Sequence, residues 1–137
     1  MYYCKMILTS KQHPNLITTS SAEMFLDDDN IFITKLNDNA LLRVEQVKEI
    51  ITHYQHFNAS KPKLVLTIAG THTNITPAAR EYAESYGASA IAEAIVVSSI
   101  AQRFLVNLYM HIRNNEHPVN VFNDIENAKK WLLSHVN

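Results

Sequence analysis

A continuous apolar run, Lys-Leu-Val-Leu-Thr-Ile-Ala-Gly at residues 63–70, limits the possible folds more than any other feature of this sequence. Unbroken apolar strands are typical of parallel sheets that are covered on both faces. The run leads through a turn to Thr76 and Pro77, which suit the N-cap and the first position of a helix, because the N–H that proline lacks has no partner there. Residues 63–87 therefore predict a strand, a turn and a helix of an open α/β sheet.

The acidic turn Asp27–Asn30 lies between the segments AEMFL and NIFITKL, and this pattern predicts a β-hairpin with a four-residue loop. Three adjacent aspartates raise the question of a calcium site. The ligand spacing of an EF-hand and its bidentate glutamate are missing, however, and Asp and Asn commonly fill hairpin turns. We therefore expect the turn to bind no metal.

Strands and helices are expected to alternate along the remaining chain. The first helix would carry Val44, Val47, Ile51 and Tyr54 on one apolar stripe. That helix is predicted at 37–58 and is capped by Asp38 or a neighbouring asparagine. The later predicted segments are a strand at 94–97 whose Ala-rich lead-in could instead extend the preceding helix, a helix opened by a Ser99–Gln102 capping box, a strand at 117–123, and a closing helix opened by an Asn123–Glu126 capping box. The order β-β-α-β-α-β-α-β-α predicts an α/β fold with a mostly parallel sheet, in which the first hairpin strand is antiparallel at an edge.

Residues 1–20 read as an N-terminal extension, because Pro14 and the polar run Thr18–Ser21 show no sustained periodicity. A short strand and an irregular arm both fit that composition. Residues 21–137 read as a single domain, since the pattern shows no repeat, linker or second core.

Composition narrows the class of function. With 47% hydrophobic residues and a net charge of −1, the chain of 137 residues is expected to be globular and lacks the clustered basic face that nucleic acid requires. The lone Cys4 excludes a disulfide framework and is most simply explained by a reducing, cytoplasmic compartment. The longest apolar run, Ala88–Val97, is interrupted by Glu93 and is too short to cross a membrane, and a signal peptide is not expected.

The turn between Gly70 and Thr76 is the strongest candidate site, because ligands of open α/β sheets gather where strands end and helices begin. We single out Thr76, His72, Thr73 and Asn74 as a possible switch or partner-binding group. The helix N-terminus could favour an anion or a phosphorylated hydroxyl, but the glycine-rich phosphate motifs are missing. Thr76 can equally be an ordinary N-cap.

The histidines and the cysteine of the sequence give little support for a metal site or a catalytic centre. His53 and His56 are three residues apart, as zinc ligands can be, yet both fall away from the apolar stripe and have no third ligand. His72 has no serine or cysteine nucleophile beside it, and Cys4 has no partner histidine. The sequence therefore predicts no catalytic residues, no cofactor and no metal.

The chain resembles small bacterial STAS/SpoIIAA-like proteins, most of all an uncharacterised branch of that fold. The resemblance lies in the order of elements, in LVLTIAGTHTNITPAAR at 64–80, in AIVVSSIAQRFLVNLYM at 94–110 and in the ending PVNVFNDIENAKKWLL at 118–133. It covers residues 22–136 and implies a SpoIIAA-like (STAS) sandwich that acts as a regulatory or binding module without intrinsic catalysis.

In anti-sigma-factor antagonists of this fold, a partner kinase phosphorylates a serine in a D-S-S-G turn at the start of the helix after the central strand. The resemblance places that serine on or beside Thr76. Here Ile75 stands in place of the aspartate, Pro77 in place of the second serine and Ala78 in place of the glycine. A threonine hydroxyl remains, on a surface that differs from the one such a kinase recognises.

The leading functional hypothesis is a non-enzymatic protein-interaction module that acts through the helix starting at Thr76 and self-associates as a homodimer. A small apolar ligand or lipid bound between sheet and helices is the alternative. An enzyme that uses His72, and a metal site at His53 and His56, are further possibilities.

Overall fold

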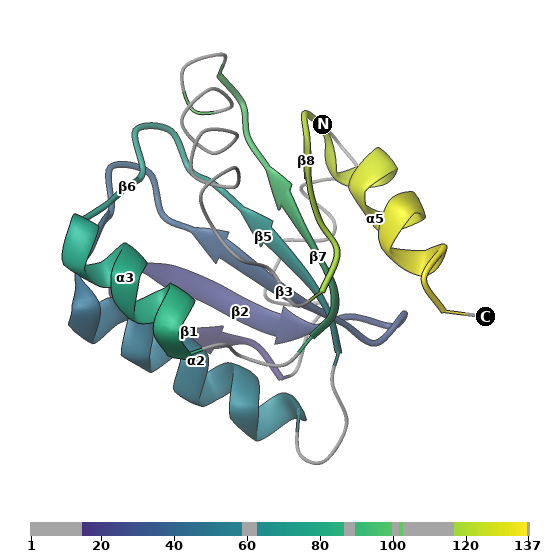
Figure 1. Ribbon diagram of the computed structural model, residues 1–137, viewed down its shortest axis with the longest axis horizontal. Coiled ribbons are helices and arrows are strands. Elements are labelled where there is room, and N and C mark those ends of the chain that lie inside the picture. Colours follow the sequence, from purple (N-terminus) through teal and green to yellow (C-terminus); the bar gives the residue numbers. More distant parts are fainter. Residues whose placement is uncertain (1–14, 59–62, 87–89, 100–101, 103–116, 137) are drawn as a thin grey trace.

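The computed structural model describes residues 15–58, 63–86, 90–99, 102 and 117–136. Its main sheet has six strands in the order β1-β2-β3-β5-β7-β8 (Figure 1). The strands are β1 (Ile17–Thr18), β2 (Ala22–Leu26), β3 (Ile31–Leu36), β5 (Lys63–Ile68), β7 (Ala90–Val96) and β8 (Val119–Phe122). Strands β3, β5, β7 and β8 are parallel neighbours, which confirms the mostly parallel sheet.

The predicted hairpin is present, with β2 antiparallel to β3. Asp27 closes its turn, because Oδ1 accepts the N–H of Asp29 and of Ile31, each at 2.9 Å. Lys129 ties the turn to the last helix, with its Nζ 2.7 Å from Oδ2 of Asp27. These contacts give Asp27 a structural role in the turn.

The hairpin strand β2 is not the edge of the sheet. Ile17 and Thr18 pair with it in antiparallel register, opposite Met24 and Glu23, so that β1 becomes the outer strand. The final residues of the segment described above as an extension therefore take part in the sheet.

The first helix begins later than its sequence pattern predicted. Helix α2 runs Val44–Asn58, and Leu41–Leu42 form a short strand, β4, that pairs in parallel with β6 (Asn74–Ile75). Gln46 helps to open the helix by accepting the N–H of Arg43 through Oε1 at 2.9 Å. The expected cap, Asp38 or a neighbouring asparagine, is wrong, because α2 begins only at Val44. Asp38 Oδ1 accepts the N–H of Thr71 at 2.8 Å instead.

Strand β7 begins at Ala90, four positions before the predicted strand, so the Ala-rich segment does not extend the helix that precedes it. Gln102 donates its backbone N–H to Ser99 Oγ at 3.0 Å, as expected for a capping box. Apart from Gln102, the helix predicted after Ser99 falls outside the described residues. The last helix, α5 (Ile125–Leu133), is capped by Asp124 rather than by Asn123, because Asp124 Oδ1 accepts the N–H of Asn127 at 2.8 Å.

Helices cover both faces of the sheet (Figure 1). Helix α5 packs its buried residues Ile125, Ala128 and Leu132 on a core that includes Leu64 and Leu66. On the opposite face lie α2 and α3 (Pro77–Tyr86), which pack on each other and on β2 and β3. Alternate residues of β5 therefore point to different cores, as expected for a central strand.

Candidate functional site

The turn at the start of α3 has the local structure that the sequence predicted. Thr76 Oγ1 accepts the N–H of Ala79 at 3.1 Å, and Thr76 O accepts the N–H of Arg80 at 3.0 Å. Thr76 is therefore the N-cap of α3, a role that is worth about 1 kcal/mol of stability.

The preceding loop is held against the end of β3. Gly70 is buried, and a Cβ placed on it would lie 2.6 Å from the carbonyl oxygen of Leu36. Thr73 Oγ1 donates to the carbonyl of Asn37 at 3.0 Å, and the N–H of Asn39 donates to the carbonyl of Thr71 at 2.7 Å. These bonds join residues more than thirty positions apart and fix the shape of the loop.

The remaining candidates in this loop face solvent. His72 is exposed and has a φ of 59°, a left-handed conformation that is uncommon outside glycine. Asn74 is exposed, and its Oδ1 accepts the N–H of Ile75 at 2.9 Å. The side chains of Thr73, Asn74 and Thr76 thus make hydrogen bonds within this region. Among the described residues, no group of three or more His, Cys, Asp or Glu side chains could hold a metal ion.

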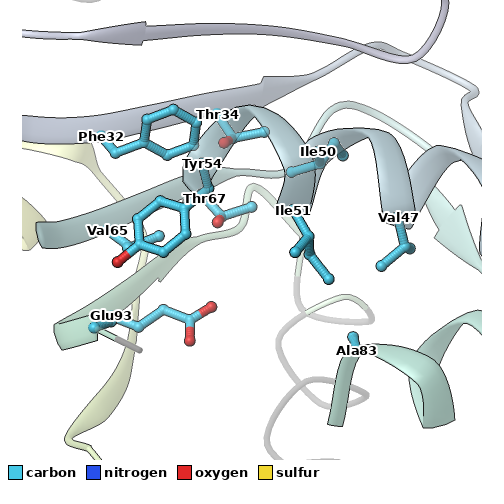
Figure 2. A pocket seen from close by; sticks show the side chains of 11 residues that line it. Phe32, Thr34, Val47, Ile50, Ile51, Tyr54, Val65, Thr67, Ala83 and Glu93 are labelled. Atoms are coloured by element: carbon cyan, nitrogen blue, oxygen red, sulfur yellow. The ribbon is translucent and has the colours of Figure 1, made fainter. Parts of the chain in front are cut away.

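A pocket lies elsewhere, between α2 and the sheet (Figure 2). Residues of the neighbouring strands β3 and β5 form its floor. In the parallel register of these strands, Phe32 lies opposite Val65 and Thr34 lies opposite Thr67. Four residues of α2 face this floor, and Ala83 of α3 closes one side. The helical residues that line the pocket are Val47, Ile50, Ile51, Tyr54 and Ala83. The pocket has a volume of about 180 Å³ and is partly open.

Aromatic packing forms one end of the pocket. The rings of Phe32 and Tyr54 meet edge to face, with centroids 5.2 Å apart. The Tyr54 hydroxyl oxygen accepts the N–H of Lys63 at 3.3 Å. Burial raises the pKa of Tyr54, the bond from Lys63 opposes that rise, and the negative charge of Glu93 adds to it. The phenol is therefore protonated at neutral pH.

Glu93 brings a carboxylate to the floor of the pocket. It follows Val65 across the sheet, and its Oε1 lies 3.3 Å from Nε2 of His117, which precedes β8. Both side chains are largely shielded, with 21% of Glu93 and 13% of His117 exposed.

The sequence suggested an apolar ligand between sheet and helices as an alternative, but it did not identify the residues of this pocket. Glu93 was noticeable as the charge that interrupts the apolar run Ala88–Val97, and a charge within a central strand is a signal for a special environment. Its neighbours on the floor come from strands that lie side by side only after folding. Tyr54 was correctly placed on the apolar stripe of α2, but its hydroxyl contact with β5 has no local signature.

The histidines do not assemble a metal centre in the part of the chain that the structure describes. His56 is exposed and stacks on Phe57, with ring centroids 5.9 Å apart, while His53 is half-buried. His135 packs on Trp131 at 4.5 Å, and its Nδ1 lies 2.9 Å from the carbonyl oxygen of Trp131. Cys4 and His111 lie outside the described residues. Within the described helices, none is long and apolar enough to cross a bilayer.

A mostly parallel sheet with an antiparallel hairpin at one side and helices on both faces defines an α/β protein (Figure 1). A crystal structure of an uncharacterized DUF3478-family protein with a SpoIIAA-like fold, from Shewanella loihica PV-4, matches with a TM-score of 0.60. The match covers 85% of this chain and 98% of that one at 13% identity, and so shows a shared fold. The chain belongs to the family described as Domain of unknown function (DUF7793), whose model matches residues 24–136.

A crystal structure of a protein with unknown function from Arthrobacter sp. FB24 also matches, at 19% identity over 85% of this chain and 95% of that one, with a TM-score of only 0.31. A search of the curated proteins found no significant match.

Proposed function

We propose that this protein is a binding module without catalytic activity of its own, and that it takes a small, mainly apolar ligand between α2 and the sheet. The observation that supports this function is the pocket of about 180 Å³ walled by Val47, Ile50, Ile51 and Phe32. An apolar cavity of roughly 150 Å³ is enough to bind benzene. The fitting ligand is therefore a single ring or a short alkyl chain.

The hydroxyl groups that line the pocket are poorly suited to catalysis. A general acid or base works best when its pKa lies near the working pH. Burial moves the pKa of Tyr54 upward, farther from neutrality. The hydroxyls of Thr34 and Thr67 are ordinary alcohols, and alcohols need an activating base before they become nucleophiles.

Toluene is a suitable probe, because it matches the pocket in size and has no polar group. We expect toluene to bind the full-length chain, and Ala83→Phe to weaken that binding at least tenfold by filling the pocket with an aromatic ring. Chemical shift changes in NMR spectra would report the affinity and its location. Circular dichroism would show whether the variant is folded.

Ala78→Phe is the matched control for this experiment. Ala78 lies on the same helix but is exposed, so the added ring stays outside the pocket and toluene affinity should not change. Shift changes that spread over the surface, or equal affinity in both folded variants, would contradict the proposed ligand site. Native mass spectrometry of protein purified from cells should also detect a retained small ligand.

A protein-interaction role, regulatory or self-associating, is a second candidate and is supported by the surface beside the loop. We define the loop surface as Leu41, His72 and Asn74. Leu41 of β4 is 43% exposed and pairs in register with Asn74 of β6, whereas His72 is exposed in the same loop. In such a contact Leu41 would supply the apolar centre, and His72 and Asn74 would supply the polar rim.

Self-association through the loop surface is testable by sedimentation velocity. If the chain forms a homodimer there, Leu41→Glu should raise the dimer dissociation constant at least tenfold, because a charge would be buried in an apolar contact. Ile91→Glu provides the control, since Ile91 is 36% exposed on β7, away from β4 and β6. A monomeric chain at all concentrations, or equal effects of both changes, would exclude this interface.

A further inference from the structure

The floor of the pocket carries a charge at a defined place. Phe32, Val65 and Glu93 form one row across β3, β5 and β7, because each lies opposite the next in parallel register. The row places the carboxylate of Glu93 on the same face as the rings that wall the pocket. Figure 2 shows this carboxylate beyond the Tyr54 ring, reaching toward the side of the pocket closed by Ile51 and Ala83.

Two contacts with the segment before β8 support the position of Glu93. Its backbone N–H donates to the carbonyl of Pro118 at 2.9 Å, which fixes the strand beside β8. Its Oε1 meets His117 Nε2 at 3.3 Å, and only 13% of that histidine is exposed. A carboxylate can accept several hydrogen bonds at once, so the contact with His117 is compatible with a further donor from a ligand.

The charge of Glu93 determines which end group of a ligand is favoured in the pocket. Among the described residues that line the pocket, Glu93 alone has a carboxylate, and none has a basic side chain. Walls of low polarity screen charges poorly, so a ligand carboxylate beside Glu93 would be strongly disfavoured. A hydroxyl or an ammonium group would instead donate a hydrogen bond to an ionised acceptor, which is the stronger kind.

We propose that the pocket selects apolar molecules whose end group donates a hydrogen bond, an alcohol or an amine, and rejects the corresponding carboxylates, with Glu93 as the residue that sets this preference. This inference rests on the proposed function, because it names the class of ligand for the same pocket. This preference would distinguish the pocket from that of a fatty-acid carrier, whose ligand ends in a carboxylate.

Benzylamine, benzyl alcohol and benzoate share one ring and differ in the end group, so they isolate the effect of the donor. Titration calorimetry or NMR titration with the full-length chain, at a pH of about 8 where free histidine is neutral, would give each affinity. We expect benzylamine and benzyl alcohol to bind, and benzoate to bind at least tenfold more weakly than either. In Glu93→Gln, which keeps the shape but removes the charge, benzoate and benzylamine should differ by less than threefold.

Glu81→Gln is the charge-matched control, because Glu81 is exposed on α3 and does not line the pocket. It should preserve the preference of the unmodified chain. Equal affinities for the three probes, tighter binding of benzoate, or an unchanged preference in Glu93→Gln would overturn the role of Glu93. If the unmodified chain still bound toluene in the pocket, the proposed function would stand and only the ligand class would be wrong. If the unmodified chain did not bind toluene either, both proposals would be wrong.

Discussion

Replacing Gly70 by alanine is expected to lower the free energy of unfolding by about 3 kcal/mol, the upper part of the usual range for overpacking. The added Cβ would lie 2.6 Å from the carbonyl oxygen of Leu36 and 2.8 Å from that of Asn37. Both contacts are to backbone, so relief requires β3 or the loop to move. Urea denaturation followed by circular dichroism would measure the loss.

Thr71→Ala provides the comparison for Gly70→Ala. Thr71 is the next residue along the chain, and its side chain is exposed, whereas the hydrogen bonds of the loop use its backbone N–H and carbonyl. This change should alter stability by no more than about 0.5 kcal/mol, as surface substitutions usually do. A similar loss in both variants would show that the loop is generally fragile and that the close approach of Gly70 to β3 is not the cause.

Leu132→Ala is expected to cost about 3 kcal/mol, because it removes a fully buried side chain and leaves a cavity. Leu132 is 0% exposed and lies in the core that α5 shares with Leu64 and Leu66. The same denaturation experiment measures the change. Because α5 covers the face of the sheet opposite the pocket, the affinity for toluene should be the same in the folded variant.

Leu133→Ala carries the same chemical change one position later. Leu133 is only half-buried at the border of that core, so its loss should cost less than half as much. Equal costs at the two positions would mean that α5 is not docked through the face that contains Leu132. A loss of toluene binding in Leu132→Ala at full folding would show that the two faces are coupled.

The elements best predicted from the sequence are those whose signals are local. The hairpin follows from its apolar segments and acidic turn, and α3 begins at Pro77 because Thr76 supplies the cap. The continuous apolar run at 63–68 became the central strand β5 as predicted, with Leu64 and Leu66 buried in one core and Val65 only partly buried against the other. The SpoIIAA-like fold, suggested by resemblance, is confirmed.

The predictions of secondary structure and helix caps were wrong where a contact with a distant segment overrode the local preference. Leu41 and Leu42 fit a helix by pattern, but they become β4 because Asn74 and Ile75 offer a strand partner. Asp38 could cap a helix, yet it accepts the N–H of Thr71, a residue 33 positions away. Asp124 and Asn123 were equally able to cap α5, and the observed backbone, with Asp124 extended at φ −145°, decided between them.

The amino-acid sequence by itself determined which segments become strands and helices and which faces are apolar, because periodicity, caps and turns act over a few residues. Only the tertiary structure decided that Glu93 would share a floor with Phe32 and Val65 and lie beneath α2. Strand order and register create that neighbourhood, and they are set by packing between segments far apart in the chain, which leaves no trace in any one stretch of sequence.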